Sequence, residues 1–363
     1  MKTLEELCKK ESSSIAQKDL DGNEGEYPIY GASGFIKNVD FYTQDKPYIA
    51  VVKDGAGVGR VMKLPAKSSV IGTMQYIIPN EDVNTDFLAY ALENMNLAKY
   101  YTGATIPHIY FKDYCKEQLP VYSMEEQSRI AFVLNKASFI IECRKKQLSK
   151  LDELVKARFV ELFGDTVTNE KNWPRLTLGD ICEIGSSKRV FEKDYVPNGV
   201  PFFRTKEIVE LSKGNSISTE LFIAEEHFEE LKKSYGVPKK DDLLISAVGT
   251  IGTIWIVSGD FEFYFKDGNL IQIKSSPNFN SIFMKYLLDE LIANYKKEMS
   301  TGTAYSALTI AGLKKMMVYD VPLAHQEQFA AFVEQVDKSK SAIQKSLDKL
   351  EELKGALMQK YFG

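Results

Sequence analysis

A glycine-rich turn, an acidic pair and a histidine are the residues whose types and spacing could support catalysis in this chain. The turn Gly-Ala-Gly-Val-Gly at residues 55–59 could cradle a phosphate, but it lacks the GxxxxGK[ST] ending and lies between strand-like segments, which favours a structural hairpin. Asp241 and Asp242 could hold a metal ion, yet adjacent strand residues point to opposite faces, so we interpret them as solvated charges. His108 is interpreted as a packed or hydrogen-bonding side chain rather than a ligand or base.

Metal, cofactor and membrane signatures are not evident in the sequence. Cys8, Cys115, Cys143 and Cys182 are scattered, which predicts free thiols in a reducing cytoplasm, and three separated histidines argue against a His/Cys metal site. We find no Walker A sequence, no methyltransferase-like Asn-Pro-Pro-aromatic motif and no Pro-Asp…Glu-x-Lys nuclease pattern. The sequence contains no run of about 18 apolar residues, and its start lacks the apolar core of a signal peptide. These observations predict a chain that is not an enzyme, with no cofactor or metal of its own and no membrane span.

Basic and small polar residues in turn-rich segments are the candidates for nucleic-acid contact. Reading base edges requires Arg, Lys, Asn, Gln or Thr on a rigid loop. The candidates are Arg60, Lys63 and Lys67 in the first half and Lys188, Arg189, Arg204 and Lys206 in the second. Thr102-Gly103 and Thr301-Gly302 could present backbone N–H groups to a phosphate, because glycine allows close approach. For each of these residues the alternative is a solvated charge or an ordinary turn.

The charge balance limits how tightly the chain alone could bind DNA. Its formal net charge is −4 at pH 7. No segment forms the strongly basic block expected of a protein that binds nucleic acid tightly without partner subunits. A DNA-binding function therefore requires locally clustered basic residues, or partner subunits that supply phosphate contacts.

One long helix is predicted at residues 127–164, and it must position the segments around it. Alternating steps of four and three residues meet mostly apolar side chains with charged flanks, which is typical of a coiled coil. At about 1.5 Å per residue the helix would span roughly 55–60 Å, so its apolar seam needs a partner. Arg144 and Arg158 interrupt the seam and are expected to extend toward solvent or to pair with acidic residues. The predicted interface residues are Ile130, Leu134, Ile141, Leu148, Leu151 and Val155.

The chain repeats this helix 199 residues later, at residues 326–363. QLSKLDELVKA (147–157) corresponds to SLDKLEELKGA (346–356), and each copy ends in Phe-Gly. Only about ten residues, 165–174, separate the first helix from the segment that follows. The two helices are therefore expected to run antiparallel, with a domain at each end and a pseudo-two-fold axis between the halves. The second set of predicted interface residues is Phe329, Val333, Ile343, Leu347, Leu350 and Leu357.

The segments before the two helices are duplicated as well. TLEELC (3–8) resembles TLGDIC (177–182), and a strand, glycine turn and strand at 47–64 recur at 241–257. The halves align without a gap from about residue 87 to 164 at the 199-residue offset, and with shorter offsets upstream. This order predicts an α+β protein with two similar mixed α/β domains separated by two long helices that form an antiparallel coiled coil. The predicted boundaries are 1–120 and 165–320 for the domains, and 121–164 and 321–363 for the helices.

The ordered duplicate resembles the DNA-specificity subunits of type I restriction–modification systems. The resemblance is carried by YPIYGASG (27–34), VGRV (58–61), VGTIG (248–252) and LPVYSMEEQSRIAFVL (119–134), and it covers essentially the whole chain. It implies two target-recognition domains, each reading one half of a split double-stranded DNA target, and a helix pair that sets the spacer and docks two methyltransferase subunits. Those partners would bring S-adenosylmethionine, and motor and nuclease subunits would bring ATP and Mg.

The second copy departs from the first at the start of its helix. Ala324-His325-Gln326 stands where the first copy has Glu125-Glu126-Gln127, which weakens the expectation of partner contact at that end. Two other functions stay open on the sequence alone. One is a scaffold whose duplicated domains bind protein partners without reading DNA, and the other is an enzyme with an unrecognised site.

Overall fold

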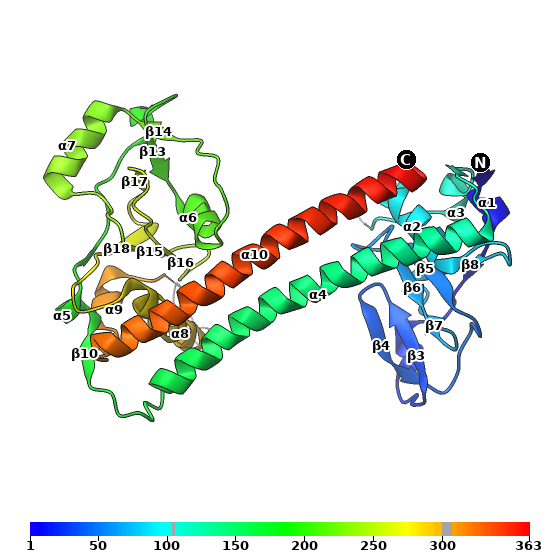
Figure 1. Cartoon of the computed structure of the whole chain (residues 1–363), viewed down its shortest axis with the longest axis horizontal. Helices are drawn as coiled ribbons and strands as arrows, with labels where there is room; N and C mark the ends of the chain where they lie inside the picture. The colour runs from blue at the N-terminus through cyan, green and yellow to red at the C-terminus, as the bar shows by residue number, and fades with distance from the viewer. Residues whose placement is uncertain (104–105, 300–306) are drawn as a thin grey trace. The chain divides into compact units, whose positions relative to one another are not determined.

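The computed structural model describes residues 1–103, 106–299 and 307–363, with the side chains of 298 and 299 left out. The chain divides into two compact units, residues 1–148 with 342–363, and residues 149–341. Each unit combines a mixed domain with parts of both long helices, α4 (Met124–Phe163) and α10 (Leu323–Phe362) (Figure 1). No helix in the described part of the chain is long and apolar enough to cross a membrane.

The first unit contains a four-stranded antiparallel sheet and a three-stranded sheet. The four-stranded sheet has the order β2 (Cys8–Ser12), β8 (Met74–Pro79), β5 (Tyr48–Val52) and β6 (Val61–Leu64). The other has the order β4 (Gly34–Val39), β3 (Tyr27–Gly31) and β7 (Ser69–Val70), and β1 (Lys2–Thr3) pairs with β9 (Gln118–Leu119). The short helices are α1 (Leu4–Leu7), η1 (Gln17–Leu20), α2 (Thr85–Asn94), η2 (Leu97–Tyr100) and α3 (Phe111–Tyr114).

The second unit repeats the four-stranded sheet of the first and has a second, different four-stranded sheet. The repeated sheet has the order β11 (Ile184–Gly185), β18 (Leu270–Ile273), β15 (Leu243–Ser246) and β16 (Ile254–Ile256). The other has the order β12 (Tyr195–Val196), β14 (Phe222–Ile223), β13 (Val200–Phe203) and β17 (Tyr264–Phe265), and β10 (Arg175–Thr177) pairs with β19 (Met317–Tyr319). The helices are α5 (Leu178–Ile181), η3 (Glu192–Asp194), α6 (Thr205–Ser212), α7 (Glu225–Tyr235), α8 (Ser281–Met299) and α9 (Ile310–Lys315).

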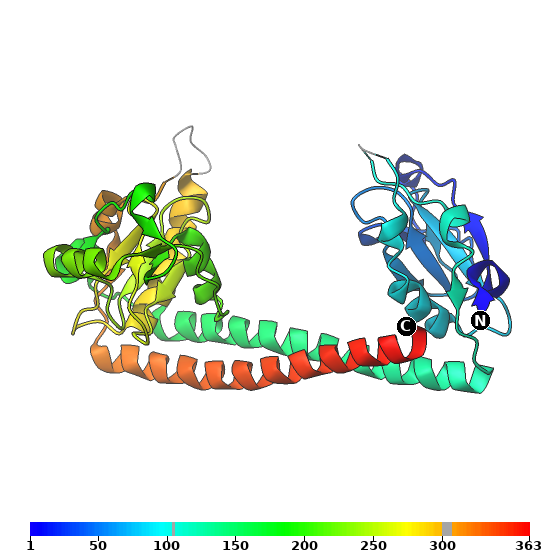
Figure 2. The same ribbon diagram turned by 90° about the horizontal axis from the view of Figure 1, so that it is seen from above.

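The two long helices pack side by side and antiparallel within each unit (Figure 2). In the second unit the Phe159 and Phe329 rings lie 5.5 Å apart, and Lys340 Nζ lies 2.6 Å from Asp152 Oδ1. In the first unit Lys145 Nζ lies 2.7 Å from Glu351 Oε1. The predicted fold class, two mixed domains with an antiparallel pair of long helices, is thereby confirmed.

A buried glutamine joins the domain to the start of a long helix in each unit. Gln127 Oε1 accepts the Asn84 backbone N–H at 2.8 Å, and its Nε2 donates to the Tyr122 carbonyl at 3.0 Å. Gln326 repeats this arrangement with the Asn280 N–H at 2.9 Å and the Val321 carbonyl at 2.7 Å. Because an unpaired buried amide is costly, this residue fixes the angle at which the helix leaves the domain. These hydrogen bonds explain why both copies carry a glutamine at this position.

The predicted gapless alignment from residue 87 is wrong within α2 and α8. The Phe87 ring lies 5.1 Å from that of Phe362, and the Phe283 ring lies 4.8 Å from that of Phe163, which corresponds to Phe362. These contacts match Phe87 with Phe283, an offset of 196 residues, whereas the long helices keep the offset of 199. Residues three apart share a helix face, so similarity of pattern alone leaves two registers open.

The glycine turn at 55–59 is a structural hairpin, as predicted. It joins the antiparallel strands β5 and β6, and the Gly59 N–H donates to the Val52 carbonyl at 2.8 Å. Gly59 has a φ of +84°, and a Cβ atom there would lie 2.5 Å from the Ala98 backbone nitrogen. Only glycine fits this position, because η2 passes directly against the turn.

The prediction that Asp242 is a solvated charge is wrong. Its side chain is buried, and its carboxylate accepts hydrogen bonds from the Lys239 N–H at 2.9 Å, Gln272 Nε2 at 2.6 Å and the Ser275 N–H at 2.8 Å. Asp242 therefore ties the start of β15 to β18 and the segment after it. Its neighbour Asp241 is exposed and has a positive φ of 69°.

Candidate nucleic-acid interface

Two loops of the first unit form one continuous edge beside the β5–β6 hairpin. The Gly55 N–H donates to the Pro107 carbonyl at 2.9 Å, and the Ile109 N–H donates to the Lys53 carbonyl at 3.0 Å. His108 Nδ1 contacts the Asp54 carboxylate, so His108 is a hydrogen-bonding side chain as predicted. Backbone and side-chain hydrogen bonds therefore hold the described parts of the two loops together.

Thr102 and Gly103 lie in the second of these loops. Thr102 and His108 exchange both backbone hydrogen bonds, at 2.8 and 2.9 Å. Gly103 has a φ of +97°, and a Cβ atom there would lie 2.6 Å from the Ile106 carbonyl oxygen. Both residues are exposed, so their positions are accessible to a phosphate. Their predicted counterparts Thr301 and Gly302 lie outside the described residues.

The three predicted basic residues of the first unit lie in different surroundings. Arg60 is exposed at the end of the hairpin turn and donates from Nη1 to the Ala32 carbonyl at 2.8 Å. Lys67 is exposed with a positive φ of 53°. Lys63 instead faces the helices, with Nζ 3.2 Å from Asp86 Oδ1 and 2.6 Å from Asn135 Oδ1. To contact DNA, Lys63 would therefore have to leave these partners.

Three of the four predicted basic residues of the second unit pair with carboxylates. Arg189 Nε lies 2.9 Å from Asp267 Oδ2, and Lys206 Nζ lies 3.0 Å from Glu220 Oε1. Arg204 caps α6 and bonds Glu207 at 2.9 Å and Glu220 at 3.0 Å. Lys188 is exposed, with its ammonium 5.4 Å from the centre of the Tyr235 ring.

Hydrogen bonding within this pairing shifts both partners toward their charged forms. Hydrogen bonds from Lys206 and then Arg204 lower the pKa of Glu220, and the hydrogen bond with Glu207 raises the pKa of Arg204. A DNA phosphate would therefore have to displace carboxylates from Arg204 and Lys206.

Sequence reasoning missed the exposed apolar and aromatic side chains of the first unit's second loop. Tyr101 and Ile106 are 58% and 65% exposed, and Tyr110 is 49% exposed with Lys112 Nζ 5.2 Å from its ring centre. Large apolar and aromatic side chains near a basic residue are suited to stacking or wedging against bases. The sequence feature that could have identified this surface is Tyr110-Phe111-Lys112, which combines aromatic residues with a lysine.

The predicted interface residues of the long helices fall into two groups. Half of them are buried, and the other half are partly exposed toward the middle of the helices or at the end of α10. The buried set is Ile130, Leu134, Val155, Phe329, Val333 and Leu347, and the partly exposed set is Ile141, Leu148, Leu151, Ile343, Leu350 and Leu357.

The side chains of the two seam arginines, Arg158 and Arg144, contact residues of the long helices. Arg158 Nη1 lies 2.8 Å from Glu161 Oε2, and its guanidinium lies 5.9 Å from the centre of the Phe332 ring. Arg144 Nη1 donates to Gln147 Oε1 at 2.8 Å. Among the described residues, no group of three or more His, Cys, Asp and Glu side chains could hold a metal ion.

Comparisons with known proteins agree with this duplicated arrangement. A family model described as the type I restriction modification DNA specificity domain matches residues 1–153 and 170–354. A Haemophilus influenzae protein that carries the name of a type I restriction enzyme specificity subunit is 24% identical, over 89% of this chain and 83% of its own. The MjaIX specificity subunit of Methanocaldococcus jannaschii is 25% identical, over 78% of this chain and 69% of its own.

Solved structures share the fold over the full length. The crystal structure of the type I restriction–modification S subunit from M. genitalium matches with a TM-score of 0.66 and 18% identity, covering 100% of this chain and 95% of that one. A chain from a structural study of type I system assembly matches with a TM-score of 0.56 and 15% identity, covering 99% and 96%. Given a family match over most of its length, this chain belongs to the type I restriction modification DNA specificity domain family and carries that domain twice.

Proposed function

We propose that this chain is the non-catalytic subunit that gives a type I restriction–modification complex its DNA sequence specificity, with each domain reading one half of a split target. The observation that supports this most directly is the duplication of the whole domain and helix, combined with different loops in the two copies. A DNA target with two identical half-sites would not require different loops in the two domains. The helix pair would set the spacer between the half-sites.

The proposed DNA contacts of the first unit are Arg60, Lys67, Thr102 and Gly103. All four are exposed; Arg60 and Lys67 lie in the segments after β5 and β6, and Thr102 and Gly103 lie after η2. Among the four candidates of the second unit, Lys188 is exposed and lies against the Tyr235 ring. Arg189, Arg204 and Lys206 would exchange their carboxylate partners for phosphates. The formal net charge of −4 fits a subunit that binds DNA tightly only with its partners.

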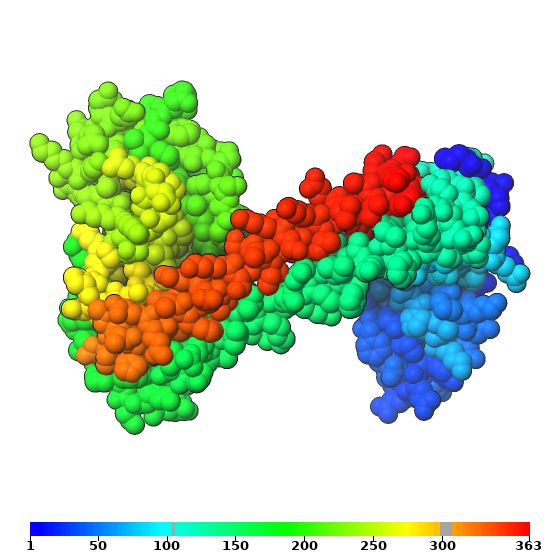
Figure 3. Space-filling view, in the orientation of Figure 1, coloured from blue at the N-terminus to red at the C-terminus, as the bar shows by residue number. Residues whose placement is uncertain are grey.

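Two methyltransferase subunits are the proposed partners on the helix pair, and S-adenosylmethionine would be bound by them. Motor and nuclease subunits would supply ATP hydrolysis with Mg and cleavage. In the space-filling view the surface of α10, coloured orange to red, is uncovered along much of the viewed side (Figure 3). A face of this kind is open to a partner helix.

Binding of the reconstituted chain–methyltransferase complex to DNA tests the proposal. We expect sequence-selective binding that weakens with salt, and Lys67→Ala should lower the slope of log K against log salt by about one. Lys9→Ala is the matched control, because Lys9 is exposed on β2 at the sheet edge opposite to β6. Partner assembly without sequence-selective DNA binding would instead support a protein-binding scaffold.

A further inference from the structure

The first unit carries a row of polar and aromatic side chains on the edge beside its β5–β6 turn. The row consists of His108, Tyr110 and Lys112, and its members contact one another in order. The His108 and Tyr110 rings lie 4.1 Å apart, and Lys112 Nζ lies 5.2 Å from the centre of the Tyr110 ring. Ile109, between the first two, is buried in the core, whereas Tyr110 and Lys112 are exposed and the His108 side chain is 26% exposed. The row is therefore accessible from solvent.

A carboxylate fixes the imidazole of His108. His108 Nδ1 bonds Asp54 Oδ1, and Lys53 Nζ lies 4.0 Å from Asp54 Oδ2. Because an ionised carboxylate can only accept hydrogen bonds, this contact places the proton of the neutral ring on Nδ1. His108 Nε2 is then a hydrogen-bond acceptor. In the major groove of DNA, the amino groups of adenine and cytosine are the donors that such an acceptor can read.

The second unit builds the same edge from its backbone. In the first unit the Ile109 N–H donates to the Lys53 carbonyl at 3.0 Å. In the second unit the Leu308 N–H donates to the Ala247 carbonyl at 3.2 Å. Leu308 follows Ile109 by 199 residues, the offset of the long helices. The two segments are therefore structurally equivalent.

The side chains of the row have no counterparts in the second unit. At the offset of 199 the residues that match His108, Tyr110 and Lys112 are Ala307, Thr309 and Ala311. Val248 follows Ala247 where Asp54 follows Lys53. Since the second unit keeps the backbone contact without these side chains, the fold of the edge does not require the row or its carboxylate.

Tyr110 stands at a position where threonine is the better residue for helix stability. Thr309 is the N-cap of α9, and its hydroxyl accepts the Gly312 N–H at 3.0 Å. Tyr110 is the N-cap of α3 and makes no side-chain capping hydrogen bond. Threonine is among the favoured N-cap residues because its oxygen satisfies a free N–H of the first turn. The first copy thus has an exposed ring in place of a cap, which indicates a role outside the helix.

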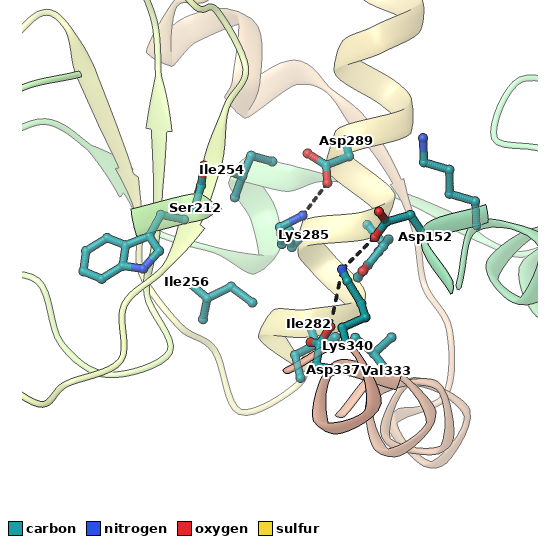
Figure 4. A pocket seen from close by; sticks show the side chains of 13 residues that line it. Asp152, Ser212, Ile254, Ile256, Ile282, Lys285, Asp289, Val333, Asp337 and Lys340 are labelled. Carbon is teal, nitrogen blue, oxygen red and sulfur yellow. Dashed lines mark hydrogen bonds and ion pairs between the residues drawn. The ribbon is translucent and has the colours of Figure 1, made fainter. Parts of the chain in front are cut away.

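The second unit does not replace the row with the charged residues of its cavity. This cavity of about 520 Å³ lies between the domain and its parts of the long helices (Figure 4). Lys340 Nζ lies 2.6 Å from Asp152 Oδ1, and Lys285 Nζ lies 2.7 Å from Asp289 Oδ2. These charges pair within the chain, and the cavity lining includes none of the described residues 247–253 and 307–311. The row is therefore a feature of the first unit.

We propose that His108 and Tyr110 determine specificity in the first half of the DNA target. His108 Nε2 accepts a hydrogen bond from the amino group of an adenine or cytosine, and Tyr110 contacts the neighbouring base. Asp54 is the positioning residue that orients His108, and Lys112 pairs with a phosphate. The second domain reads its half-site through other residues. This assignment rests on the proposed function, because it names the reading residues of the first domain.

Competition binding tests the assignment on the chain–methyltransferase complex, with duplexes that each differ by one base pair from the target mapped for the wild-type complex. His108→Ala should lower the preference for the correct pair about tenfold at one position of the first half-site and leave the other positions unchanged. Tyr110→Thr, which introduces the residue of the second copy, should lower the preference at the neighbouring position. His227→Ala is the control, because this histidine lies on α7 of the second unit and should not change the first half-site.

The role of Asp54 is tested by combining variants. Asp54→Ala should relax the same position as His108→Ala, and the double variant should show no further loss, because Asp54 acts only through His108. A merely structural role for Asp54 would instead add to the loss caused by His108→Ala. If His108→Ala prevents assembly, Tyr110→Thr and Asp54→Ala decide the outcome.

The possible results separate this inference from the proposed function. If the wild-type complex selects a split target while His108→Ala and Tyr110→Thr keep every base preference, only the assignment of the row fails. A uniform loss of affinity for all duplexes would also overturn it, since that result indicates phosphate contact without base reading. If the wild-type complex shows no sequence selectivity, the proposed function itself fails.

Discussion

Replacing Gln326 by methionine tests whether this buried glutamine holds the second domain to its helix. Methionine keeps the length of the side chain but removes both its acceptor and its donors. Gln326 is 0% exposed, and the change leaves the Asn280 N–H and the Val321 carbonyl without their partner. At about 1–3 kcal/mol for each of the two buried groups left unpaired, we expect a loss of roughly 2–6 kcal/mol in the free energy of unfolding.

The assay is thermal unfolding of the full chain by calorimetry, where each unit has its own transition if the two unfold independently. For a unit of this size, about 2–4 °C is lost per kcal/mol, so the transition of the second unit should fall by roughly 4–24 °C. Gln127→Met should lower the other transition and so assign it. Gln328→Met is the control, because Gln328 is exposed on the same helix. If Gln326→Met and Gln328→Met unfold at the same temperature, the glutamine does not join domain to helix.

Three further predictions concern thiol reactivity, the helix pair and the division between domains. Burial raises the pKa of Cys8 to about 12 and that of Cys182 to about 11, and it also raises the pKa of Cys115. Iodoacetamide at pH 8 should therefore label the half-buried Cys143 first and reach the other three cysteines only in denaturant. Equal labelling of all four in the folded chain would refute the burial. Inserting seven residues after Lys145 in α4 and after Glu351 in α10 keeps the apolar repeat, so the methylated motif should retain both half-sites with a longer spacer, and an unchanged spacer in an active complex would exclude the helices as the ruler. Exchanging residues 165–320 for a related domain should change one half of the motif only; a change in both halves or in neither would contradict separate reading.

The fold was predictable where the sequence carries a long, repeated pattern. The seams of α4 and α10 repeat over many turns, and each half presents the same order of strand, glycine turn, strand and helix, so a few substitutions do not hide them. The register between α2 and α8 was not predictable, because shifts of three residues preserve the face of a helix. It became clear only from the contacts of Phe87 and Phe283 with the ends of the long helices.

Individual side chains of the candidate site were harder to predict because their roles depend on residues distant in the chain. Asp242 looks like a surface charge until Gln272 and Ser275 come to it from across the sheet. Lys63 looks like a reading residue until Asp86 and Asn135 meet it from two helices. None of these four partners can be identified from the residues that neighbour Asp242 or Lys63 in the sequence.

Genome-wide methylation mapping in cells that carry this chain and its methyltransferase partner tests the central claim most directly. The account predicts a split motif, with two specified half-sites of unlike sequence separated by an unspecified spacer of fixed length, that disappears when this chain is deleted. A continuous motif, or a split motif that persists without this chain, would contradict the claim that its two domains each read one half of the target.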